Sequence, residues 1–154
     1  MFPNLAPSQN LAVLAALNPV SQAAGTITTG WIDMGEFAYL AAIVQTGVMG
    51  ASGTVDAIFQ QATDNSGTGA KAVTGAAITQ MVKATDDNRQ SILEIREDAL
   101  DMANNFRFVR LSLTVGTATS LVSALVLGTH PRRGPATARN ATTVKSVTRQ
   151  PASI

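Results

Sequence analysis

The chain has 154 residues, which is enough for one domain. It contains no cysteine and a single histidine, His130, so disulfides and thiolate metal sites are excluded and little remains for Ser–His catalysis. Charged residues make up only 14% of the chain, and no apolar run approaches the ~20 residues that cross a bilayer. The composition argues against an enzyme, against a cofactor or metal site, and against a membrane partner. It favours a protein whose function is to form contacts with other molecules.

Residues 1–25 are interrupted by prolines and precede the regular part of the sequence. Within them, Leu11 to Leu17 is predicted to form one or two helical turns that end before Pro19. Apolar residues on a segment of this kind need a surface to pack against. We therefore expect an N-terminal arm, with Leu11, Leu14 and Leu17 as candidate interface residues.

Residues 26–130 form the predicted body, and their dominant hydrophobic period is two, which is typical of half-buried strands. The alternating stretches are Val55–Phe59, Ile78–Val82, Ser91–Glu97 and Phe106–Val115. Two further stretches are apolar on both faces, which leaves open a central strand or a buried helix: Phe37–Val44 and Ser120–Leu127.

Turn-forming residues separate these stretches, at Gly47–Gly53, Asp64–Gly69, Thr85–Asn88 and Asn104–Asn105. A single short helix is predicted within Arg96–Asn104. Because no long helices connect the strands, the predicted fold is all-β, a single antiparallel β-sandwich or jelly-roll-like domain. Extended arms are expected at residues 1–25 and 131–154.

The C-terminal segment, residues 131–154, has no acidic residue, whereas residues 1–70 have no basic one, so the net charge of +1 hides an asymmetry. The segment is predicted either to bind an acidic surface or to be a solvated, disordered end. It lacks interleaved aromatic residues, which argues against base stacking and makes nucleic acid a less favoured partner, although phosphate contact by Arg132, Arg133 and Arg139 stays open on charge alone. Its basic residues are candidate interface residues: Arg132, Arg133, Arg139, Lys145 and Arg149.

Candidate chemical motifs each have a structural alternative. Ser66–Lys71 is glycine-rich, but it lacks the Gly-Lys-Ser/Thr order of a phosphate loop and favours a tight surface turn. Asp86–Asn88 lacks the calcium-loop pattern and favours a hairpin turn. The acidic residues between Glu94 and Asp101 are predicted to form ion pairs with nearby arginines. Trp31 is either a core residue or an interface or sugar-stacking residue.

Five stretches of the body occur in a fixed order: Gly30–Met34, Phe59–Asp64, Ser66–Lys71, Ala77–Gln80 and Phe108–Val115. In order and spacing they resemble a tailed-bacteriophage family of small virion structural proteins, over about residues 26–135. The resemblance implies a β-rich protein of the phage head, a capsid cement or decoration protein, with no catalytic residues. It implies the major capsid protein and other copies of the chain as partners.

Two alternatives to capsid cement stay open. The chain could belong to the neck or tail of the virion, as a connector or ring, and copy number per particle would separate the two placements. It could instead be a carbohydrate-binding sandwich that uses Trp31 and Tyr39 as platforms, which predicts solvent-exposed rings.

Overall fold

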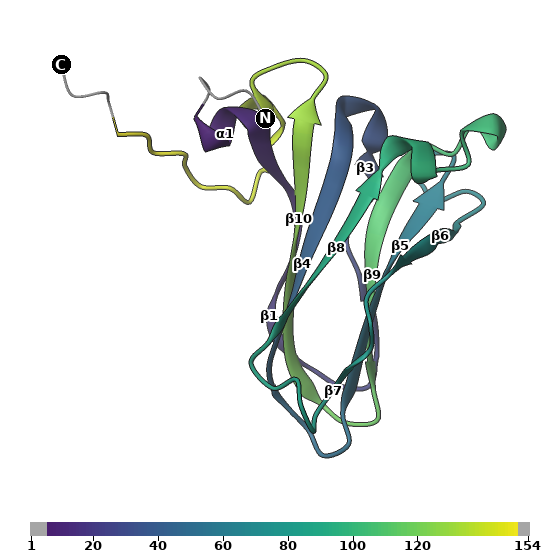
Figure 1. Cartoon of the computed structure of the whole chain (residues 1–154), viewed down its shortest axis with the longest axis vertical. Helices are drawn as coiled ribbons and strands as arrows, with labels where there is room; N and C mark the ends of the chain where they lie inside the picture. Colours follow the sequence, from purple (N-terminus) through teal and green to yellow (C-terminus); the bar gives the residue numbers. More distant parts are fainter. Residues whose placement is uncertain (1–5, 151–154) are drawn as a thin grey trace.

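The computed structural model describes residues 6–150 and consists of two antiparallel β-sheets packed against each other (Figure 1). The first sheet has the order β1-β10-β4-β8, with bounds Leu11–Gln22, Ser120–Pro131, Phe37–Met49 and Gln90–Arg96. The second has the order β2-β9-β5-β6, with bounds Gly25–Thr28, Phe108–Gly116, Thr54–Ala62 and Lys71–Ala77. Short strands β3 (Ile32–Asp33) and β7 (Met81–Val82) pair with β9 and β5. The predicted all-β sandwich is confirmed.

Helical structure within the described residues is limited to single turns. The α-helix α1 spans Pro7–Asn10, and the 3₁₀ turns are η1 Met34–Glu36, η2 Glu97–Ala99, η3 Met102–Asn104 and η4 Ala136–Arg139. The short helix expected within Arg96–Asn104 is therefore two separate 3₁₀ turns, η2 and η3.

The core lies between the two sheets and is built from alternate residues of their strands. On β9, Val109, Leu111, Leu113 and Val115 are buried, as the alternation in the sequence predicts. On β4 the buried positions include Phe37, and on β5 Phe59 lies fully inside. Because directly paired strand residues point to the same face, this alternation places one side of each sheet in the core. The two stretches with an ambiguous pattern are both strands, β4 and β10.

The N-terminal arm expected at residues 1–25 is wrong for residues 11–22, and so is the helix expected there. These residues form β1, which pairs antiparallel with β10 from Leu11 opposite Thr129 to Gln22 opposite Ser120. Leu17 is buried, and Leu14 packs against the core. Pro19 lies in a break of the pairing register, and an edge strand tolerates proline because half of its backbone groups face away from the sheet. Residues 1–5 lie outside the described residues.

The strand expected at Ile78–Val82 is also corrected. The edge of the second sheet is β6, Lys71–Ala77, followed by the two-residue strand β7. Met81 of β7 is buried in the core. Gly75 has φ of +76° within β6, which breaks the regular alternation and explains why a strand pattern is weak there.

Candidate interaction surfaces

The C-terminal segment divides into a packed part and an exposed part. Residues 132–141, which we call the C-terminal root, return to the sandwich beside β1. The Val13 N–H donates to Asn140 Oδ1 at 2.9 Å, and the Ala141 N–H donates to the Val13 carbonyl at 2.7 Å. Ala136 is fully buried. The extended arm expected from residue 131 onwards is therefore wrong for the root, which caps the free edge of β1.

Two of the predicted interface residues are engaged within the root. Arg132 forms an ion pair with Glu97 of η2, and Arg139 forms one with Glu36 of η1. The Arg132 backbone N–H also donates to the Glu36 carbonyl at 3.0 Å. These arginines neutralise acidic groups of their own domain, so the positive charge they offer to a partner is reduced.

Residues 142–150, the C-terminal tail, leave the folded body near α1 and are mostly exposed (Figure 1). The tail has no strand or helix and carries Lys145 and Arg149 without an acidic residue. Arg149 Nε donates to Ser8 Oγ at 2.9 Å. Among the ion pairs of residues 6–150, none involves Arg133 or Lys145. Arg133 and the tail therefore carry basic groups that no ion pair within residues 6–150 neutralises.

The outward side of the four-stranded sheet carries an apolar row that crosses all four strands. The row consists of directly paired residues: Ala16 on β1, Leu125 on β10, Ile43 on β4 and Ile92 on β8. Ile92 is 67% exposed and Leu125 is 43% exposed. We call the outward side chains of these four strands the outer face. Contiguous exposed apolar residues mark interaction sites, whereas isolated ones do not.

The outer face is uncharged at its centre. Beside the row, β4 contributes Gln45 and β10 contributes Ser123, while the charged side chains Glu94 and Arg96 lie at the β8 edge. Two shallow hollows of about 400 and about 230 Å³ lie on this face, and both are lined by Pro19, Gln45 and Ser123. An apolar centre with a polar rim is the usual anatomy of a protein–protein interface.

The outer face is a candidate site that was not predicted from the sequence. Its signal was present, since the stretches that became β4 and β10 are apolar on both faces. That pattern by itself predicts burial on both sides. Only one side is covered by the second sheet, so the outward leucines and isoleucines remain in solvent.

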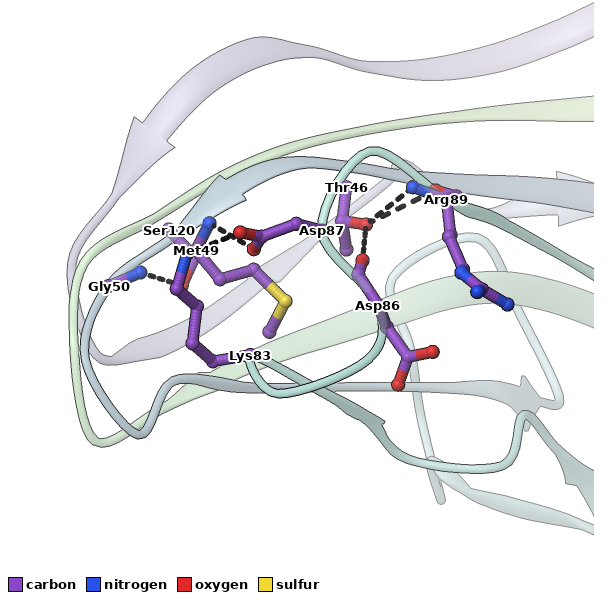
Figure 2. Close-up of polar contacts among 8 residues, drawn as sticks. All are labelled: Thr46, Met49, Gly50, Lys83, Asp86, Asp87, Arg89 and Ser120. Atoms are coloured by element: carbon purple, nitrogen blue, oxygen red, sulfur yellow. Dashed lines mark hydrogen bonds and ion pairs between the residues drawn. The ribbon is translucent and has the colours of Figure 1, made fainter.

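A polar network fixes the loop between β7 and β8, at the end of the sandwich opposite the C-terminal root (Figure 1 and Figure 2). The Thr46 hydroxyl donates to the Asp86 carbonyl at 2.6 Å, and the Met49 N–H donates to Asp87 at 2.9 Å. The Asp87 carboxylate also pairs with Lys83, and this ion pair and the Met49 N–H lower the pKa of Asp87. These contacts hold Asp86–Asn88 in a turn, as the sequence predicts.

A metal role for this loop has no further support. Asn88 has φ of +56°, the left-handed conformation that asparagine tolerates in turns. Among residues 6–150, no group of three or more His, Cys, Asp or Glu side chains is placed to hold a metal ion.

The ion pairs predicted between the acidic stretch Glu94–Asp101 and nearby arginines are confirmed only for Asp98, which pairs with Arg96. Asp101 pairs instead with a lysine, and Lys71 Nζ lies 2.5 Å from Asp101 Oδ2. Lys71, followed by the Asn104 amide, lowers the pKa of Asp101. Lys71 also lies 4.1 Å from the centroid of the Phe106 ring, so the glycine-rich stretch before it ends at a structural ion pair and cation–π contact.

The two aromatic residues considered as sugar platforms lie in different parts of the sandwich. Trp31 precedes β3, and the Arg110 guanidinium of β9 lies 4.6 Å from its ring centroid. Tyr39 is on the outward side of β4, with its ring centroid 5.2 Å from that of His130. Both rings are partly exposed, but their positions do not form one continuous platform.

No protein-family model matches the chain, and no curated protein matches it. Within residues 6–150, no helix is long and apolar enough to cross a membrane.

Proposed function

We propose that the chain is a bacteriophage virion structural protein, a capsid cement or decoration protein that binds the major capsid protein on the head. The sequence resemblance supports this role, and so does a rigid sandwich with an exposed basic extension. The observation that carries the proposal is the division of the C-terminal segment into an anchored root and an exposed tail.

The root gives the tail a fixed point of departure. Asn140 and Ala141 are hydrogen-bonded to Val13, so the tail begins at one edge of the sheet. Nine extended residues reach about 30 Å, which is enough to contact a neighbouring subunit. Lys145 and Arg149 would be attracted to acidic groups on that subunit, and the ordering of the tail would accompany binding.

A truncation after Ala141 tests the role of the tail, because it removes the tail and keeps the root. Binding of the truncated and full-length chains to phage heads lacking the protein would be measured by quantitative gel analysis of sedimented particles. We expect strong loss of occupancy for the truncation and for K145E/R149E. The matched control T143Q/S146Q should bind like the original chain. Unchanged occupancy of the truncated chain would contradict the tail contact.

Copy number tests the placement. Quantitative mass spectrometry of purified virions should give on the order of hundreds of copies for capsid cement, and about a dozen or fewer for a closed neck or tail ring. A ring-like number would replace the head assignment with the neck or tail alternative. Absence from purified virions would refute a virion role.

A further inference from the structure

We propose that the outer face binds the outer face of a second copy of this chain, giving a two-fold symmetric dimer. The inference goes beyond the proposed function, because it concerns the purified chain and requires no particle. It starts from the apolar row of Ala16, Leu125, Ile43 and Ile92, which runs across the whole sheet.

The row is suited to pairing with itself. A two-fold axis in the plane between two such faces, parallel either to the row or to the strands, brings one row onto the other. In both arrangements Ile43 and Leu125, on the two central strands, meet apolar residues of the second copy. This contact repeats the packing that the domain already uses inside, where two sheets lie about 10 Å apart with interdigitating side chains.

The size of the face fits a stable dimer. Strands of 12, 12, 13 and 7 residues form it. With a spacing of about 4.8 Å and a rise of about 3.4 Å per residue, their projected area is about 700 Å². A standard specific interface buries about 800 Å² on each partner. The two hollows beside Gln45 and Ser123 provide space for apolar side chains of the second copy, as interface hot spots require.

The charges on the face favour a second copy over the charged partners of the tail. Glu94 and Arg96 are one acidic and one basic group at the same edge, so two copies do not repel each other through a net charge. Nucleic acid or an acidic protein surface would need lysine or arginine side chains near the row, and the described residues of β1, β4 and β10 include neither.

The test is the mass of the purified full-length chain, measured by sedimentation equilibrium from about 1 to about 100 μM. We expect twice the 15.9 kDa of one chain. The variant I92K/L125K changes two exposed residues of the row and should weaken the dimer at least about 100-fold, the effect of losing a hot spot. The matched control M102K changes an apolar residue of η3 that is 58% exposed and lies off the outer face. It should remain dimeric.

Each outcome decides the proposal. Circular dichroism first establishes that both variants keep the β-sheet spectrum; if I92K/L125K is unfolded, the single variant I92K at the exposed edge strand replaces it. A chain that is monomeric at 100 μM would overturn the inference, and so would a dimer that I92K/L125K leaves intact. A monomeric chain whose occupancy on heads still depends on Lys145 and Arg149 would overturn the dimer and leave the proposed function standing.

Discussion

Replacing Asn140 by alanine tests whether the C-terminal root is an integral part of the sandwich. The Asn140 side-chain oxygen accepts the Val13 N–H at 2.9 Å, on the edge of β1 that faces away from β10. Alanine leaves this partly buried N–H without its acceptor, at a cost of about 1–2 kcal/mol. For a domain of this size, each kcal/mol lowers the melting temperature by about 2–4 °C. We therefore expect a decrease of about 2–8 °C.

Thermal denaturation followed by circular dichroism measures this decrease, and hydrogen exchange locates it. In N140A the Val13 amide and residues 136–141 should exchange faster, while the amides of β9 in the core should change only with global stability. The variant N140D keeps an acceptor oxygen and serves as the matched control, with most of the stability retained. If N140A melts like the original chain and Val13 stays protected, the root is held by other contacts and the reasoning is refuted.

Two further changes test the packing and the loop network. G128A should lower the free energy of unfolding, measured by urea denaturation, by about 1–3 kcal/mol. The reason is that the added Cβ would lie 2.7 Å from Leu14 Cδ1 and 2.8 Å from the buried Phe37 ring. A urea midpoint equal to or higher than that of the original chain would contradict this packing. D87N should lower the melting temperature at pH 7 but not near pH 2. The lowered pKa of Asp87 beside Lys83 means that its stabilisation is complete above the ordinary value of 3.8 and is lost as the pH falls through the folded value. A difference that grows on acidification would contradict this assignment.

The strands with one buried and one solvated face were predictable from the sequence. On β9 and β8 the buried residues alternate with polar ones, as Leu93 and Ile95 do with Glu94 and Arg96. The turn residue Asn88 was predictable as well, because asparagine tolerates its positive φ. In these cases the local pattern and the tertiary environment impose the same requirement, so the pattern alone is sufficient.

The N-terminal strand was not predictable from local pattern, because its stability comes from a partner far along the chain. β1 pairs with β10, more than 90 residues away, and its register shifts around Leu14 and Pro19 break the strict alternation. The same holds for the C-terminal root. Asn140 is 127 residues from Val13, and nothing in the residues around it indicates which edge it caps.

The outer face shows a different reason for a missed prediction. A strand that is apolar on both sides indicates that both sides avoid water, but not which chain provides the cover. Within this domain the second sheet covers one side of β4 and β10 only. The two-sided apolar pattern of β4 and β10 therefore fits the proposed dimer, in which a second copy covers the outer face, better than it fits the single chain.

The proposed dimer surface and the tail are connected through β1. The root holds the tail at the free edge of β1, and β1 also contributes Ala16 to the apolar row of the outer face. A two-fold pair therefore carries two tails from one rigid body. Once one tail of the pair has bound to the shell, the second tail is held near the shell at a high effective concentration. Pairing would therefore raise the avidity for a repetitive shell without any new kind of contact. Disrupting the row would then weaken shell binding even though Lys145 and Arg149 are unchanged.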